Sequence, residues 1–211
     1  MTTRGTTRGN GRRWGSTEQT RAHLLDAARA VFANRGYADA GIAEVVETAG
    51  SSVGSLYHHF GGKADLFTAL WERYRDEQHD IAAGAVAAAR DRGETDPFAL
   101  FEAGARAFLD ATWENRDLVT MMHDGEAPPG FQRLLRESGE QWVRSNLRLL
   151  GADDARPVSR VLVALLTSFI GEARREVAAA GSAAEAAELV AAMTGLLGRI
   201  RPTIEAELYQ G

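Results

Sequence analysis

The chain has 211 residues, a net charge of −5 and no cysteine, so disulfide bonds and zinc sites built on thiolates are excluded. Hydrophobic residues make up 45% of the sequence and charged residues 25%, which is typical of a globular protein with a sizeable core. We find no apolar run long enough to cross a membrane and no apolar segment of a secretory signal, so we expect a cytoplasmic protein.

Charge is distributed unevenly along the chain. Basic side chains outnumber acidic ones in residues 1–63, whereas the remaining residues are acidic, which indicates one end that faces a polyanion and an acidic body. Met1 to Gly15 contains arginines, no acidic residue and no apolar period. We expect a disordered basic arm, in which Arg12 and Arg13 contact the phosphates or minor groove of DNA. The alternative is a solvated tail without a role.

Three helices are predicted after the arm. The first begins at Ser16, and Gly36 is expected to end it, because glycine readily adopts the left-handed conformation of a helix C-cap. The second covers about Ile42 to Ala49 and the third Ser52 to His59, with a sharp turn at Gly50-Ser51 between them. Two short helices joined by such a turn are typical of a helix-turn-helix, whose second helix reads base edges in the major groove of DNA.

The third helix is predicted to have two different faces. Ser52 can cap its N-terminus, and Leu56 and Phe60 recur at a helical spacing that would anchor it to the domain. Its polar side chains lie on or beside the other face and can bond phosphates or bases. The predicted DNA-binding residues are Ser52, Val53, Ser55, Tyr57, His58, His59, Lys63, Arg12 and Arg13. An ordinary polar surface helix is the alternative.

The block from Leu24 to Phe67 resembles the DNA-binding domain of the TetR family of transcriptional repressors. The resemblance rests on agreement in residue type and spacing at Ala27 to Phe32, Gly36-Tyr37, Ile42, Val45-Val46, Ala49-Gly50, Ser52, Gly54 to Phe60, Lys63 and Leu66-Phe67. The remaining two thirds of the chain match the family only in being helical and of the right length. The resemblance implies a non-enzymatic regulator that binds a double-stranded DNA operator and a small-molecule effector.

Some positions depart from the family pattern. The family usually has an apolar residue where Ser51 stands and often lysine where Val53 stands. Near Ala40 and Gly41 it usually has serine or threonine, which would cap the second helix and contact a phosphate. Fewer polar groups than usual are therefore expected to face the DNA, and the operator sequence is not carried over from relatives.

The rest of the chain also predicts helices, which gives an all-α fold of about nine helices. A long fourth helix, from about Lys63 to Asp91, would belong to the DNA-binding domain at its start and to the body at its end. The predicted domains are a disordered basic arm over residues 1–15, a three-helix helix-turn-helix domain over residues 16–62, and a larger ligand-binding and dimerisation domain over residues 63–211.

The last two predicted helices carry wide apolar stripes. Helix-turn-helix proteins usually bind two half-sites as symmetric dimers, and the family resemblance implies that these two helices pair with their mates in a four-helix bundle. In a lone subunit the same stripes would be core. The predicted residues of the homodimer interface are Val161, Leu165, Phe169, Met193, Leu197 and Ile200.

Aromatic and methionine side chains concentrate in the fourth to seventh helices. Most are expected in the core, and several in a pocket for an apolar or aromatic molecule. The pocket candidates are Trp71, Tyr74, Phe101, Phe108, Trp113, Met121, Met122, Phe131 and Trp142. Trp113, Met122 and Phe131 are the preferred ones, and no cofactor is expected. A ligand bound there could change DNA binding only by favouring one of two conformations.

Two other classes of function fit parts of the sequence. His123, Asp124 and Glu126 could suggest the metal or acid–base site of an enzyme, but their spacing matches no recognised ligand set and favours a solvated loop. His79 is placed on a charged helix surface. The other class is a helical small-molecule-binding or interaction protein that has lost specific DNA binding, which the weak cap at Gly41 would allow.

Overall fold

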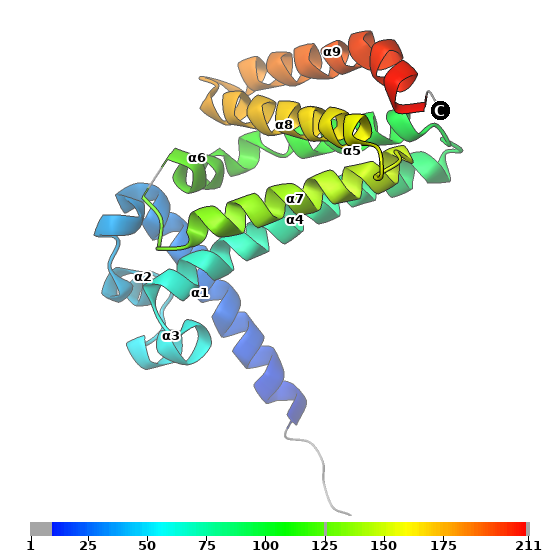
Figure 1. Cartoon of the computed structure of the whole chain (residues 1–211). Coiled ribbons are helices and arrows are strands. Elements are labelled where there is room, and N and C mark those ends of the chain that lie inside the picture. Colours follow the sequence, from blue (N-terminus) through cyan, green and yellow to red (C-terminus); the bar gives the residue numbers. More distant parts are fainter. Residues whose placement is uncertain (1–9, 125, 210–211) are drawn as a thin grey trace, which may run out of the picture. The chain divides into compact units, whose positions relative to one another are not determined.

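The structure is a computed structural model that describes the backbone of residues 10–124 and 126–209, and the side chains of residues 17–123 and 126–209. Over these residues the chain forms helices and no strand, which confirms the predicted all-α class (Figure 1). No helix in this part of the chain is long and apolar enough to span a membrane. The elements are α1 (Asn10–Asp39), α2 (Ile42–Thr48), α3 (Val53–Phe60), α4 (Lys63–Asp91), α5 (Pro97–Asp110), the 3-10 helix η1 (Trp113–Asn115), α6 (Arg116–Asp124), α7 (Phe131–Leu150), α8 (Pro157–Ala179) and α9 (Ala183–Tyr209).

The observed helix boundaries differ from the predicted ones mainly at α1. This helix begins at Asn10 rather than at Ser16, and its helical backbone is interrupted at Gly36, where φ is 75°. A positive φ at this position agrees with the expected glycine cap. Residues 1–9 of the predicted arm, and the side chains of Arg12 and Arg13, lie outside the described part of the chain.

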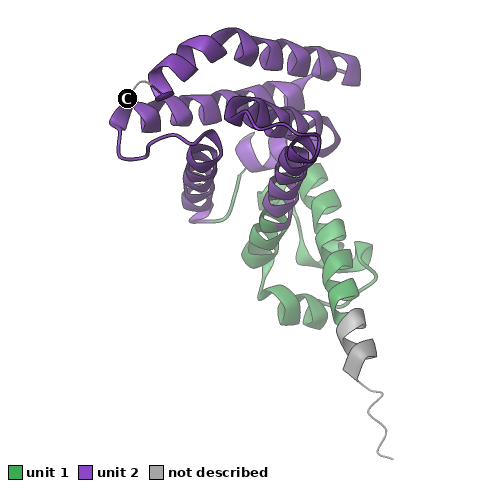
Figure 2. Ribbon diagram, turned by 90° about the vertical axis from the view of Figure 1, so that its right-hand side faces the viewer, with its two compact units in different colours: residues 1–72, 125–128 green, residues 73–124, 129–211 purple. Residues whose placement is uncertain are grey.

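The chain divides into two compact units, drawn in different colours in Figure 2. Unit 1 comprises residues 1–72 and 125–128, and unit 2 comprises residues 73–124 and 129–211. The division falls within α4, which is one continuous helix. The first turns of α4 therefore belong to unit 1 and its later turns to unit 2.

Unit 1 has a small apolar core to which α1, α2, α3 and the start of α4 contribute. Phe32 of α1 and Phe67 of α4 are buried and meet edge to face, with ring centroids 5.4 Å apart. Leu56 of α3 is fully buried, as is Leu24 of α1. Such aromatic and aliphatic packing is the main source of stability in a domain of this size, and it holds α3 by one face.

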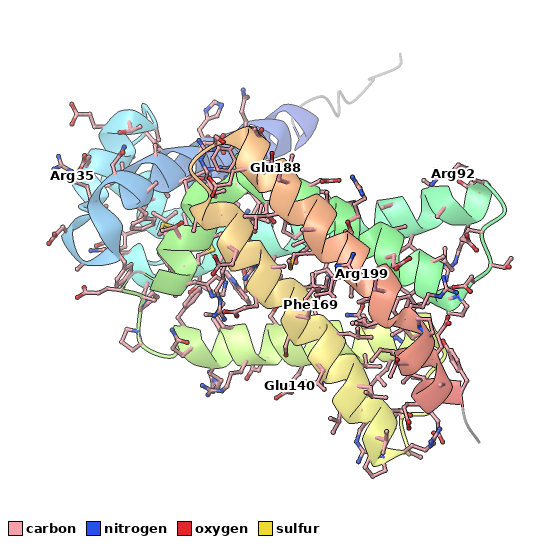
Figure 3. All side chains as sticks on the ribbon, turned by 90° about the horizontal axis from the view of Figure 1, so that it is seen from above. Arg35, Arg92, Glu140, Phe169, Glu188 and Arg199 are labelled. Carbon is pink, nitrogen blue, oxygen red and sulfur yellow. The ribbon has the colours of Figure 1, made fainter. Side chains whose placement is uncertain are left out.

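Unit 2 is built around α5, which contacts α7, α8 and α9. Phe98 and Phe101 of α5 are buried in a core that α8 and α9 share, and these two helices lie side by side in Figures 1 and 3. Asp96 caps α5, since its carboxylate accepts from the amide of Ala99 at 2.8 Å. That bond, and the contact of Arg201 from α9 with the same carboxylate, hold the pKa of Asp96 below its usual value.

Candidate functional site

The turn between α2 and α3 is closed by backbone hydrogen bonds. Gly50 has a φ of 59°, its amide donates to the carbonyl of Glu47 at 3.1 Å, and the amide of Ser51 donates to the carbonyl of Val46 at 2.9 Å. These bonds satisfy the last carbonyls of α2 and turn the chain sharply. At its other end α2 begins after Gly41 without a side-chain cap, which confirms the weak cap predicted there.

α3 is fixed at both ends. The hydroxyl of Ser52 accepts from the amide of Ser55 at 3.1 Å, which confirms the predicted N-cap. At the C-terminal end Gly61 has a φ of 73°, and its amide donates to the carbonyl of Tyr57 at 3.1 Å. A β-carbon at Gly61 would lie 2.7 Å from the carboxylate of Asp65, so both backbone conformation and space favour glycine.

The two faces of α3 differ in exposure. Leu56 and Phe60 are buried, at 0% and 6% relative exposure, whereas Tyr57 is 51% exposed and Val53 is 47% exposed. The exposed residues are Ser52, Val53, Tyr57 and His58, with Ser55 and His59 half-buried. The buried face anchors the helix, and the other face offers hydroxyl, phenol and imidazole groups that can bond phosphates and base edges.

Lys63 lies at the start of α4, where the sequence placed it, but its ammonium group is engaged within unit 1. Its Nζ donates to the carbonyl of Ala38 at 2.8 Å and lies 4.8 Å from the ring centroid of Tyr37. Tyr37 packs edge-on against Phe67, with ring centroids 5.2 Å apart, and burial raises the pKa of its phenol. An ammonium has three donors, so Lys63 can hold the end of α1 and still contact a phosphate.

The predicted pocket residues belong to both units. Trp71 is buried in unit 1, and the others lie in unit 2. In unit 2 the buried ones are Tyr74, Phe101, Phe108, Met121, Met122 and Phe131, and the half-buried ones are Trp113 and Trp142. The guanidinium of Arg116 lies 4.1 Å from the ring centroid of Trp113, so this tryptophan packs against a charged side chain. Met122 and Phe131 are almost wholly enclosed.

Unit 2 contains a set of polar side chains that we call the buried polar cluster: Tyr74, Gln78, His123 and Arg174. The sequence analysis named Tyr74 and His123, but it did not consider Gln78 or Arg174. Gln78 is only 2% exposed, and neither of its amide atoms has a hydrogen-bond partner among the residues that the structure describes. A terminal nitrogen of Arg174 contacts Nε2 of His123. The prediction that His123 lies in a solvated loop is therefore wrong: it is half-buried at the end of α6, because α8 supplies a partner for it.

The placement of His79 on a charged helix face is only partly correct, since Asp76 and Asp80 act on it but its side chain is not exposed. His79 is half-buried, and its ring stacks on that of Trp142 with centroids 3.9 Å apart and planes 9° from parallel. Trp142 in turn meets Phe108 at 5.4 Å. Burial, with a smaller contribution from Arg75, lowers the pKa of His79. Among the described side chains, no group of three or more histidines and carboxylates could hold a metal ion, and Glu126 is exposed.

Helical periodicity could have located the polar cluster. Gln78 follows Tyr74 by four residues, so it lies on the same face of α4. Arg174 follows Ile170 by four residues and therefore falls on the buried stripe of α8. A polar residue within an apolar stripe was the available signal, because buried polar groups are costly unless they have a partner.

The predicted interface residues divide between surface and core. Val161 and Leu165 are 58% and 60% exposed, and with Val158, at 48%, they form an apolar stripe along one face of α8. The half-buried residues are Phe169, labelled on α8 in Figure 3, Met193 and Ile200. Leu197 is fully buried and packs in the core of its own subunit.

A helix-turn-helix with one face of its second helix exposed, followed by a larger helical body, defines a class of DNA-binding regulators. A family model described as "Bacterial regulatory proteins, tetR family" matches residues 24–70. The chain is 30% identical over 185 residues to the HTH-type transcriptional repressor BepR of Brucella suis biovar 1 (strain 1330), a match that covers 84% of this chain and 78% of that protein. The chain thus belongs to the TetR family, a family of transcriptional regulators rather than enzymes.

Two further similarities show how far the likeness extends. The HTH-type transcriptional regulator AcrR of Shigella flexneri is 38% identical over 55 residues, so the match spans only 26% of that relative's length and 26% of this chain. The crystal structure of a TetR-family transcriptional regulator from Pectobacterium atrosepticum superposes with a TM-score of 0.56 at 27% identity, over 93% of this chain and 97% of that one. Similarity in fold therefore continues well beyond the DNA-binding end.

Proposed function

We propose that this regulator is a repressor that acts in the cytoplasm, binds a palindromic DNA operator as a homodimer and is released by a small apolar or aromatic effector. The observation that supports the proposal most directly is that α3 buries one face and exposes the other. Leu56 and Phe60 anchor it, and its other face exposes side chains suited to phosphates and base edges. The BepR relative is itself named a repressor, which supports the negative sense of regulation.

The homodimer is proposed from the apolar stripe of α8. Val158, Val161 and Leu165 are large aliphatic side chains exposed along one helix face, and contiguous exposed apolar surface marks an interaction site. A two-fold dimer would bury this stripe against its own copy and would place two α3 helices on the two half-sites of a palindrome. The proposed division of the chain is an arm over residues 1–15, a DNA-binding domain over residues 16–62, and a ligand-binding and dimerisation domain over residues 63–211.

Selection of bound duplexes from a random DNA pool, at one fixed salt concentration, tests the proposal. We expect an enriched palindromic site that binds at least about 10³-fold more tightly than random duplexes, as specific regulators do. Salt must be held constant because phosphate contacts make affinity strongly dependent on it. A pool without an enriched sequence would refute sequence-specific repression.

Two observations favour a second candidate function, a helical ligand-binding or interaction protein without a specific operator. The first residue of α3 is Val53, which is exposed and can make no hydrogen bond through its side chain. α2 also lacks a capping hydroxyl that could contact a phosphate. Binding of random DNA with no preferred sequence would support this candidate.

A further inference from the structure

We propose that the effector is a small organic carboxylate with an apolar body, and that Arg174 and Gln78 bind its carboxylate group in the place now taken by the imidazole of His123. This inference rests on the proposed response to an effector and names the chemical class of that effector. It concerns unit 2 alone.

The first argument is the charge of Arg174. A guanidinium stays protonated in proteins. Arg174 is half-buried as a residue, but its Nε is buried and has no hydrogen-bond partner among the described residues. Burial lowers the pKa of Arg174, interaction with Tyr74 opposes that change, and the nearby cation Arg175 adds to it. Among the side chains that the structure describes, which do not include that of Asp124, no aspartate or glutamate is one of these groups. A buried cation without an anionic partner is unfavourable, and a carboxylate would supply one with matching two-point geometry.

The second argument is the identity of the group that now contacts the guanidinium of Arg174. Arginine can only donate hydrogen bonds, so Nε2 of His123 is the acceptor in its contact with Arg174. A neutral nitrogen is a weaker partner for a guanidinium than a carboxylate oxygen. His123 thus marks the position of an acceptor atom, and an incoming carboxylate would displace it.

The third argument is Gln78. Its side chain is 2% exposed, and both its amide nitrogen and its amide oxygen are buried without partners. It lies one turn after Tyr74 on the same face of α4, and Tyr74 interacts with Arg174. A glutamine in this state destabilises the fold, whereas its amide N–H groups could donate to the second oxygen of a bound carboxylate.

The aromatic groups around Arg174 suit the apolar body of the ligand. The guanidinium carbon of Arg174 lies 5.7 Å from the ring centroid of Phe108, which meets Trp142, on which His79 stacks. Ligand sites commonly combine such apolar walls with a few polar groups that fix orientation. Both aromatic acids and fatty acids fit this description, and the probes below distinguish them.

Thermal unfolding of the full chain without DNA, with matched pairs of probes, tests the inference. The probes are 3-phenylpropanoate and decanoate, each compared with its primary amide. We expect at least one carboxylate to raise Tm by about 2 °C or more at saturating concentration, and its amide to have a much smaller effect. If neither carboxylate exceeds its amide, the inference is wrong. A larger effect of one of the two acids identifies the aromatic or the fatty acid class.

Variants of the cluster make the test specific. Arg174→Gln should weaken binding of the active carboxylate by about 10- to 100-fold, as expected for loss of hydrogen bonds from a charged group. Arg133→Gln is the matched control, because Arg133 of α7 is exposed and paired with Glu137 at 3.7 Å; it should bind as the wild type does. Gln78→Met serves if Arg174→Gln does not fold, and should also lose affinity. Equal binding by wild type and the cluster variants would overturn the assignment.

These measurements are independent of operator binding. If no operator were found but carboxylates still bound through Arg174, the proposed function would fail while the assignment of the ligand class survived. If an operator were found and no carboxylate bound, the proposed operator binding would be supported, and the assignment of a carboxylate effector would be wrong.

Discussion

At the scale of single residues, the protein separates side chains that stabilise the fold from side chains that are placed for binding. Leu56 and Phe60 bury one face of α3, and Tyr57, between them in sequence, remains half exposed. In unit 2 a polar side chain is buried instead of an apolar one, since Gln78 is enclosed and has no hydrogen-bond partner among the described residues. Natural proteins retain such unfavourable groups mainly where function requires them. We therefore expect a substitution at Gln78 to raise stability, and a substitution at Tyr57 to weaken DNA binding without a change in stability.

Gln78→Met should stabilise the ligand-free protein. The substitution removes two buried polar atoms that have no partners, which should raise the free energy of unfolding by about 1–3 kcal/mol and Tm by about 2–4 °C per kcal/mol. Thermal unfolding measures the change. Gln141→Met, at an exposed position on α7, is the control and should leave Tm unchanged. A lower Tm for Gln78→Met would show that the amide is well satisfied in solution.

Tyr57→Phe should weaken DNA binding without altering stability. The phenol is exposed on α3, and the loss of one hydrogen bond to a phosphate should reduce affinity about tenfold for all sequences alike. Binding titrations at fixed salt measure it, and thermal unfolding of the same variant is the control. Unchanged affinity would place Tyr57 away from the DNA. Lys63 is a less specific probe, because Lys63→Ala would also remove its bond to Ala38.

At the scale of helices, capping and turn residues predicted helix ends well, whereas the periodicity of apolar residues did not separate core from interface. The Ser52 cap and the bounds of α4 were predicted correctly, since capping and chain reversal depend on a few neighbouring residues. The early start of α1 was not predicted, because its first turns have no apolar period that would indicate a helix. Periodicity also could not separate core from interface on α9, where Leu197 packs inside its own subunit.

Ser52→Ala should destabilise unit 1 and weaken DNA binding. Loss of the cap that accepts from the amide of Ser55 should cost about 1 kcal/mol. Ser52→Thr should restore both properties, whereas Ser52→Asp should restore the cap but repel DNA phosphates. Chemical unfolding and DNA titration measure the two effects. Ser51→Ala is the neighbouring control, and an equal loss of stability there would show that capping is not the cause.

His79 should make stability depend on pH. Burial and Arg75 lower the pKa of His79 in the folded protein, against the opposing effect of Asp76 and Asp80. The unfolded chain therefore binds a proton more readily, and this contribution to stability should be lost as pH falls below about 6.5 and through the lower folded pKa. His79→Gln should reduce the slope of Tm against pH, and the exposed His23→Gln should not. Equal slopes for all three proteins would contradict this account.

At the scale of the whole molecule, the family and the helical fold were predictable from the sequence, whereas the contacts of the buried polar cluster were not. The motif from Leu24 to Phe67 is local and agrees with the family over consecutive residues. The buried polar cluster joins α4, α6 and α8, which are far apart in the sequence. Periodicity could place Gln78 and Arg174 on the inward faces of their helices, but only the packing of three helices shows that Tyr74, His123 and Arg174 interact.

Leu165→Arg should convert the proposed dimer to a monomer. A charge in the exposed apolar stripe of α8 would have to be desolvated in a two-fold interface, twice over because the interface is symmetric. Sedimentation analysis measures the mass, and operator affinity should fall with it. Gln141→Arg adds the same charge on exposed α7 and should leave the mass unchanged. A Leu165→Arg dimer would place the interface elsewhere.

The central claim is that α3 reads the bases of a two-fold operator. Parallel selection of duplexes from a random pool by the wild type and by His58→Ala tests it most directly, because His58 is exposed on α3 and its loss should leave the fold intact. We predict a palindromic site for the wild type and, for the variant, a changed preference at one position repeated symmetrically in both half-sites. Selection of the same site with the same preference by both proteins would contradict the claim.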